Sequence, residues 1–122
     1  MLDEIYFDET TSEIREMVRR LAADHITPLA EECDAEDRFP SELLPILSEA
    51  GLLTLPMPEE YGGINASAQV LSVVLEEMGY AYATMGPVLL STYSPLKIVA
   101  EAGKPHQKEA FFNSMTSKPS IA

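Results

Sequence analysis

The sequence predicts an all-α protein, an orthogonal bundle of about five helices that forms one domain. In several segments, apolar residues recur at the three- and four-residue spacing of a buried helix face. Glycines and prolines stand where such segments would begin or end, and we find no convincing strand pattern. The chain has 122 residues, 46% of them hydrophobic, which is enough apolar material for a single core.

The first helix is expected to begin near Thr10, because Thr10-Thr-Ser-Glu13 has the pattern of a capping box. Pro28 lies inside the same run, where it removes one backbone hydrogen bond and clashes with the carbonyl four residues back. We therefore expect a kink there and a continuation to Ala35. On the apolar stripe, His25 is expected to be partly buried and hydrogen-bonded. The stripe consists of Ile14, Met17, Val18, Leu21, His25 and Leu29.

The second helix is expected to run from Pro40, a favoured first-turn residue, to Gly51, which tolerates the left-handed conformation that ends helices. The segment that follows reads Gly51-Leu-Leu-Thr-Leu-Pro-Met-Pro-Glu-Glu-Tyr-Gly-Gly63. It predicts a buried apolar connector that its two prolines keep extended. The Gly62-Gly63 pair indicates a tight turn before the next helix.

The third helix is expected to begin near Asn65 or Ser67 and to end around Gly79. It is apolar on most sides, which is typical of a helix at the centre of its domain. Its late residues Glu76 and Glu77 lie near the end where the helix dipole disfavours negative charge.

The fourth helix is expected over residues 88–100, with a stop at Gly103. A fifth is expected to begin at Pro105 and to place Ala110, Phe111 and Met115 inward. Beyond it, Ser120-Ile-Ala122 has the character of the start of a strand.

Charge and composition exclude several functions. The net charge is −12, and residues 1–62 carry all of it, with 16 Asp or Glu against 4 Arg. An acidic surface argues against binding to nucleic acid. The longest apolar run falls short of the ~18 residues of a membrane span, and the first residues lack a signal-peptide pattern. The single cysteine, Cys33, rules out an internal disulfide and fits a reducing cytoplasm.

The residue pattern supports neither a catalytic nor a metal site. Glu59 and Glu60 are neighbours on an extended connector and point in opposite directions, so we interpret them as a solvated loop. His25 and His106 lie on different helices without ligand spacing. The acidic neighbours of Cys33 disfavour a reactive thiolate. Three tyrosines at helical spacings, Tyr80, Tyr82 and Tyr93, are expected in the core or in an interface.

The segment 51–63 resembles the connector between the second and third helices of the acyl-CoA dehydrogenase family, where the string G-L-x-x-x-x-x-P-E-E-Y-G-G is characteristic. Other segments resemble, in order, the end of that family's first helix, the start of its second, the end of its third and the start of a late helix. These segments are His25–Ala30, Phe39–Leu44, Glu76–Tyr80 and Lys104–Phe111. The last one departs from the family pattern at His106, where a glutamate is usual.

The resemblance covers roughly Phe7 to Ala122 and therefore only the family's N-terminal helical domain. It implies that residues 1–122 are this domain, and that the middle β-domain and the C-terminal helical domain are absent. It further implies a parent enzyme that binds FAD and is a homo-oligomer.

 In such an enzyme, a catalytic glutamate of the C-terminal domain abstracts an α-proton from the acyl-CoA substrate while hydride passes to flavin N5. This chain contains neither that base nor most of the flavin site, so we expect no catalytic residue, no cofactor for this chain alone, and no activity without the missing domains or a partner chain.

The resemblance also implies a role for the fourth helix and the loop before it, which line the acyl-chain tunnel in the family. Carried over by position, the substrate-binding residues are Met85, Pro87, Leu90, Ser91, Ser94 and Pro95. Small serines beside a leucine suit a slot for an alkyl chain. The alternative for all six is ordinary helix packing, with the serines bonded back to their own backbone.

Two functions from different classes remain open. In the first, the chain is the N-terminal domain of a flavin-dependent acyl-CoA dehydrogenase and walls the acyl chain. In the second, it is a stand-alone helical interaction module of the same ancestry that works with a partner chain.

Overall fold

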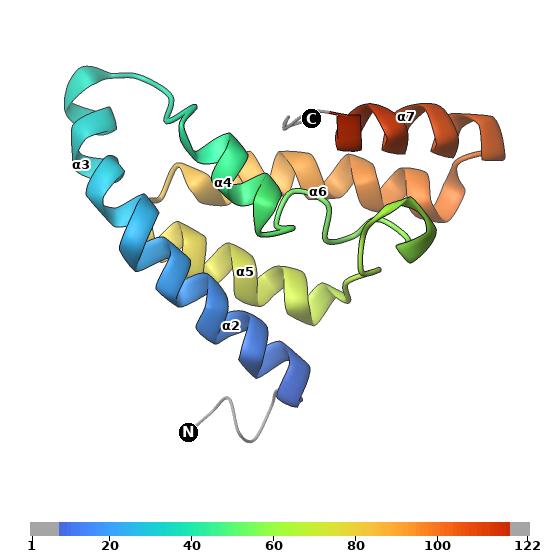
Figure 1. Cartoon of the computed structure of the whole chain (residues 1–122), viewed down its shortest axis with the longest axis horizontal. Coiled ribbons are helices and arrows are strands. Elements are labelled where there is room, and N and C mark those ends of the chain that lie inside the picture. Colours follow the sequence, from blue (N-terminus) through green and yellow to red (C-terminus); the bar gives the residue numbers. More distant parts are fainter. Residues whose placement is uncertain (1–7, 118–122) are drawn as a thin grey trace.

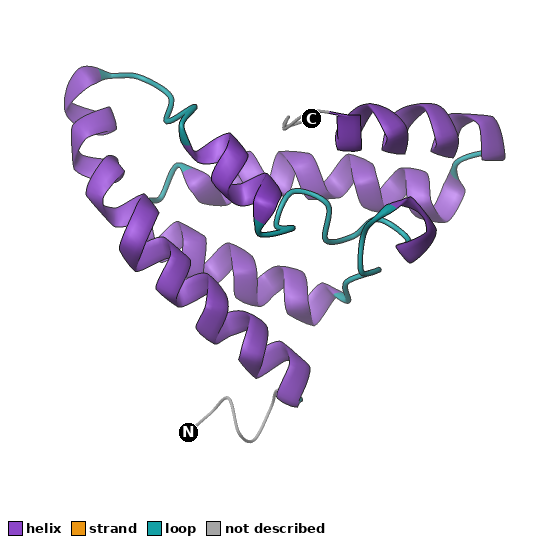
Figure 2. Cartoon of the chain, viewed as in Figure 1, coloured by secondary structure: helices purple, strands orange, loops and turns teal. Residues whose placement is uncertain are grey.

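The computed structural model describes residues 8–117, and every regular element in that range is a helix (Figures 1 and 2). The predicted all-α class is therefore confirmed. The five expected helical segments are also present, since the first three elements, α2, η1 and α3, form one continuous rod. The possible strand start at Ser120–Ala122 lies outside the described residues. In order, the elements are α2 (Glu9–Leu21), η1 (Ala22–Ile26), α3 (Thr27–Glu36), α4 (Leu43–Glu49), η2 (Glu59–Tyr61), α5 (Ala68–Ala81), α6 (Met85–Ala102) and α7 (Pro105–Ser117).

The N-cap of the rod lies two residues earlier than the capping-box pattern predicts. Asp8 is the N-cap, and its carboxylate accepts a hydrogen bond from the backbone N–H of Thr11 at 2.7 Å. Hydrogen bonds from Thr11 hold the pKa of the Asp8 carboxyl below its usual range. A carboxylate at this position stabilises the helix start twice, because it satisfies a free N–H and faces the positive end of the dipole.

The interruption expected at Pro28 is present as a π-helical turn, η1. There the Thr27 N–H donates to the carbonyl of Ala22, five residues back, so the chain widens just before the proline ring. The wide turn shifts the helical phase. Ile26 is fully buried, and His25 is exposed, so the prediction of a partly buried His25 was wrong.

Helix α4 is shorter than predicted, because Pro40 lies in a turn and regular helix begins at Leu43. Its end is as expected. Gly51 has φ +75°, its N–H donates to Ser48, and the next N–H, of Leu52, donates to Leu47. This pair of bonds is a Schellman motif, which satisfies carbonyls at the helix end.

The connector after Gly51 is buried, as predicted, but it turns where an extended chain was expected. The Met57 N–H closes a turn on Thr54, and the chain then doubles back, so that Asn65 donates to the Met57 carbonyl at 2.8 Å. Gly62, at φ +98°, makes the predicted tight turn. Gly63 allows the returning chain to lie against Met57, because a Cβ there would be 2.1 Å from the Met57 carbonyl oxygen.

Helices α5 and α6 run antiparallel through the middle of the molecule, and α7 returns along the second half of α6 (Figure 1). The N-cap of α5 is Ser67, one of the two predicted starts. Helix α6 begins at Met85, three residues before the predicted start, because Pro87 is tolerated in its first turn.

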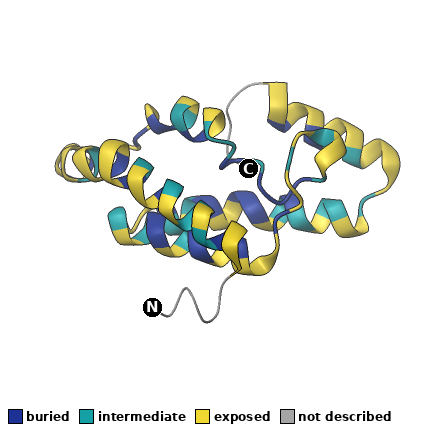
Figure 3. Ribbon diagram, turned by 60° about the horizontal axis from the view of Figure 1, so that its bottom comes forward, coloured by how far each residue is buried: buried dark blue, intermediate teal, exposed yellow. Residues whose placement is uncertain are grey.

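The core has two parts. The larger one joins the rod, α4, the connector, α5 and the first half of α6, and Figure 3 shows the buried residues where these elements meet. The smaller one consists of Met57, Leu96, Phe112 and Met115. In α7 the inward prediction holds for Met115, but Ala110 is exposed and Phe112, not Phe111, is the core ring. Tyr61 of the connector packs against that ring, with centroids 4.9 Å apart.

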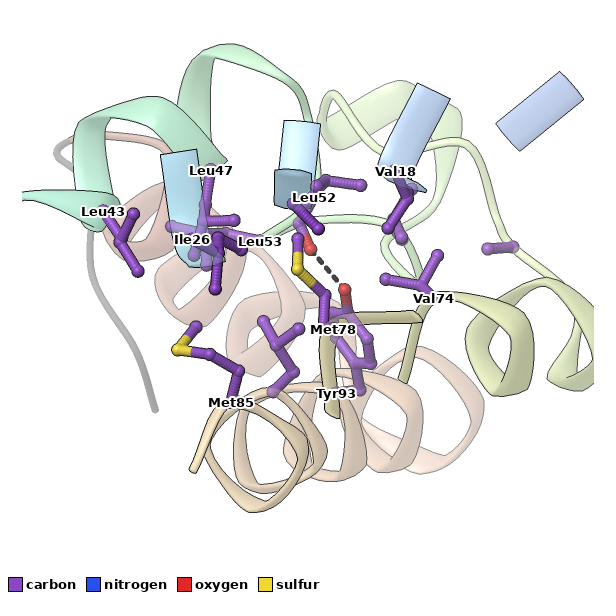
Figure 4. Packing of buried hydrophobic residues seen from close by; sticks show 14 of the residues in the cluster. Val18, Ile26, Leu43, Leu47, Leu52, Leu53, Val74, Met78, Met85 and Tyr93 are labelled. Atoms are coloured by element: carbon purple, nitrogen blue, oxygen red, sulfur yellow. Dashed lines mark hydrogen bonds between the residues drawn. The ribbon is translucent and has the colours of Figure 1, made fainter. Parts of the chain in front are cut away.

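Tyr93 links α6 to the buried connector. Its hydroxyl donates to the Leu52 carbonyl oxygen at 2.5 Å (Figure 4), and burial raises the pKa of the phenol well above its usual range. We expect Tyr93→Phe to lower the free energy of unfolding by about 1.5 kcal/mol, because it leaves a buried carbonyl without this donor. Urea denaturation tests this, with the exposed Tyr80→Phe as the control; equal effects of both variants would contradict it.

Candidate functional site

The predicted substrate-binding residues occupy different surroundings along α6. Met85 is buried in the larger core, so it does not line an open surface. Pro87, Leu90, Ser91 and Ser94 are exposed, and Pro95 is half-buried. From Met85 to Leu96 the helix carries no charged residue. Over this stretch the outer face of α6 is therefore uncharged and partly apolar, and it includes Leu90, which is 53% exposed.

A hollow of about 250 Å³ lies between α5 and α6. It brings together two of the predicted residues, Leu90 and Ser94, and leaves the other four outside. The ring of Tyr93 forms part of its lining and is fixed by its bond to Leu52. The full lining is Ala68, Leu71, Ser72, Leu75, Leu90, Tyr93, Ser94 and Lys97.

Sequence reasoning missed the α5 side of this hollow. Leu71 and Leu75 are four residues apart on one face of α5, and both are only half-buried. The signal was present in the apolar character of α5 on most sides, which we attributed entirely to a central position. A half-buried pair of leucines facing Leu90 gives the hollow its apolar walls.

Ser91 behaves as the packing alternative describes. Its hydroxyl donates to the Val88 carbonyl at 2.8 Å, and the Thr92 hydroxyl donates to the same oxygen at 3.1 Å. Pro95, four residues after Ser91, has no N–H to donate to the Ser91 carbonyl. The hydroxyls of Ser91 and Thr92 thus point back to the backbone of α6.

A second feature that the sequence did not reveal is a buried ion-pair cluster between α2 and α5. Glu77 is 8% exposed, and one of its carboxylate oxygens accepts hydrogen bonds from Arg15 and Arg19, each at 2.8 Å. Hydrogen bonds from Arg19, and then from Arg15, hold the pKa of Glu77 below its usual range despite burial. Arg15 also contacts Glu76 at 3.2 Å. These ion pairs connect α2 to α5 and so stabilise the packing of the two helices.

The other residues considered as reactive or catalytic do not line the hollow. Cys33 is buried, and this burial raises the pKa of its thiol, which disfavours the reactive thiolate. Glu59 and Glu60 are exposed, as predicted, but they belong to the 3₁₀ helix η2 and not to an extended loop. Within residues 8–117, no group of three His, Cys, Asp or Glu side chains is placed to hold a metal ion. In the same range, none of the helices is long and apolar enough to cross a membrane.

In its described part, the molecule is thus a helical domain that presents an apolar hollow and an uncharged helix face. The model of the acyl-CoA dehydrogenase N-terminal domain family matches residues 8–119, and the chain belongs to this family. The match includes the connector whose string Pro58-Glu-Glu-Tyr-Gly-Gly63 now has a structural explanation: Tyr61 packs on α7, and the two glycines permit the turn.

Curated relatives support this assignment. Over 100 residues, 80% of the chain, it is 31% identical to the short-chain specific acyl-CoA dehydrogenase of Clostridium acetobutylicum. It is 31% identical over 91% of its length to the 3-(aryl)acrylate reductase of Clostridium sporogenes, and 32% identical over 88% to the cyclohex-1-ene-1-carbonyl-CoA dehydrogenase of Syntrophus aciditrophicus. The chain spans 26% to 30% of the length of these relatives.

Proposed function

We propose that the chain is the N-terminal helical domain, residues 1–122, of a flavin-dependent dehydrogenase of acyl-CoA thioesters, and that it supplies one wall of the acyl-chain pocket. The observation that carries this proposal is the apolar hollow in which Leu90 and Ser94 of α6 face Leu71 and Leu75 of α5. Its walls suit an alkyl chain, since burial of each methylene contributes about 0.8 kcal/mol.

We do not assign the flavin to the hollow between α5 and α6. The hollow of about 250 Å³ is small even for a drug-sized ligand, which takes roughly 300–1,000 Å³. No glycine-rich phosphate loop precedes a helix in the sequence. Under the proposal, FAD and the catalytic base belong to the middle and C-terminal domains, and this chain alone is inactive. We further propose that the parent protein is cytoplasmic and homo-oligomeric and acts in fatty acid metabolism.

Filling the hollow should shorten the acyl chain that the parent enzyme accepts. Ser94→Trp places a large ring between Leu90 and Lys97, so we expect kcat/KM for long acyl-CoA substrates to fall about tenfold or more relative to short ones. The measurement is the chain-length profile of kcat/KM. Ser91→Trp is the matched control, because Ser91 is exposed on the same helix outside the hollow. An unchanged profile for Ser94→Trp would remove Ser94 from the pocket.

A second candidate function is a helical interaction module that works with a partner chain. It is favoured by the large hydrophobic side chains that are exposed in the described residues, namely Phe39, Ile64, Tyr80, Leu90 and Ile98. Apolar surface of this kind marks interaction sites when it is contiguous. The reading frame beyond the codon for Ala122 separates the two candidates. Continuation into a β-domain supports the enzyme, whereas an immediate stop codon supports the module.

A further inference from the structure

We propose that the hollow between α5 and α6 binds an unbranched alkyl chain that ends in a carboxylate, and that the carboxylate lies at Lys97. Eight described residues line the hollow, and among them Lys97 alone is charged. Of the other seven, four are aliphatic, and the rest are Tyr93 and two serines. A cation at the edge of an apolar lining is complementary to a ligand with one apolar and one anionic part.

The two ends of the hollow differ in chemistry. Figure 1 shows that α5 and α6 run antiparallel. Among the lining residues, Leu75 late in α5 is therefore expected opposite Leu90 early in α6, and Ala68 at the start of α5 opposite Lys97. Leu90 and Lys97 are two helical turns apart, or about 10 Å. A space of about 250 Å³ holds about eight non-hydrogen atoms, at roughly 30 Å³ each. An alkyl chain of about eight carbons therefore matches it in size.

The present partners of Lys97 leave room for such an anion. Its ammonium nitrogen is 3.9 Å from an oxygen of Glu101, a side chain that is 70% exposed, and a solvated pair of this kind contributes little. Lys97 also borders a neighbouring polar hollow that Glu59, Glu60 and Lys108 line. A ligand carboxylate anchored by its buried alkyl chain would meet the ammonium from the apolar side, where solvent screens the attraction less.

The simplest alternative is that the methylenes of Lys97 only cover the apolar surface while the ammonium stays in water. The two interpretations differ in the head group that the hollow prefers. An NMR titration of the full chain at low ionic strength, with octanoate, 1-octanol and octylammonium as probes, measures that preference. We expect octanoate to perturb the residues of the hollow and to bind threefold to fivefold more tightly than octanol, with octylammonium the weakest.

Two lysine variants make the test specific. Lys97→Met should abolish the preference for octanoate over octanol. Lys108→Met also removes one positive charge, but Lys108 lines only the polar hollow, so this variant should keep the preference. Equal affinity of wild-type protein for octanoate and octanol would overturn the proposal. So would perturbations that map away from the hollow, or equal effects of the two variants.

In the proposed enzyme, such a ligand corresponds to an acyl group with a carboxylate at its far end, and this extension rests on the proposed function. The titration tests the hollow of this chain directly. A protein that lacks flavin but prefers octanoate would refute the proposed function alone, and a flavoenzyme without the preference would refute this proposal alone.

Discussion

Glu77→Ala is expected to lower the free energy of unfolding by about 3 kcal/mol, because it removes a nearly buried carboxylate that accepts hydrogen bonds from both Arg15 and Arg19. Side-chain exposure is 13% for Arg15 and 9% for Glu77, so water cannot fully replace the lost bonds. Arg19 is 51% exposed and can rehydrate, which places the effect at the lower end for a broken buried pair. Urea denaturation at neutral pH measures it.

The neighbouring residue provides the control. Glu76 is on the same turn and also contacts Arg15, but its side chain is 66% exposed, so Glu76→Ala should cost less than about 1 kcal/mol. Similar losses for Glu76→Ala and Glu77→Ala would show that burial of the cluster does not determine its contribution.

The same cluster predicts a pH dependence. Because the folded-state pKa of Glu77 is lowered from 4.5, its contribution to stability is present above about pH 4.5 and is lost as the pH falls through the folded value. The stability difference between wild type and Glu77→Gln should therefore be largest near neutral pH and shrink in acid. Asp8 and Glu42, whose pKa values are also lowered, act equally in both proteins and cancel. A difference that stays constant from pH 7 to pH 3 would contradict this assignment.

Gly63→Ala is expected to destabilise the domain by about 3 kcal/mol. The new Cβ would lie 2.1 Å from the carbonyl oxygen of Met57 and 2.6 Å from its carbonyl carbon, so the backbone itself must move. That movement would strain the bond from Asn65 to the same carbonyl and the packing of Met57 in the smaller core. The change in the urea midpoint at unchanged slope measures the effect.

Gly51→Ala is the matched control for the glycine substitution. Gly51 has φ +75°, but nothing lies within 4 Å of the position of its Cβ. Only the left-handed backbone conformation is penalised, at about 1 to 2 kcal/mol. If Gly63→Ala cost no more than Gly51→Ala, the close approach at Met57 would not be the reason for a glycine at position 63.

The fold was largely predictable because its signals are local. The glycine stop at Gly51, the serine cap at Ser67 and the apolar spacing of the rod each depend on a few adjacent residues. The errors arose where a local change altered the phase of a helix. The π-helical turn before Pro28 exposes His25, and the phase of α7 buries Phe112 in place of Ala110.

The candidate site was predicted only in part, because its lining residues come from two different helices. Family resemblance indicated α6 and so gave Leu90 and Ser94, but the opposite wall comes from α5. The Glu77 cluster was missed for a similar reason: its arginines are 58 and 62 residues away in sequence. Pairings at that distance depend on how the helices pack, which periodicity alone does not specify.

The proposal that the domain walls the acyl pocket of a flavoenzyme is tested most directly in the native protein that contains it. That protein should be purified and titrated with acyl-CoA substrates of increasing chain length while its flavin absorbance is followed. We predict a bound flavin that acyl-CoA bleaches, with a chain-length profile that Ser94→Trp shifts toward short substrates. A native protein without flavin, or one whose bleaching by acyl-CoA is the same with and without the tryptophan, would contradict the account.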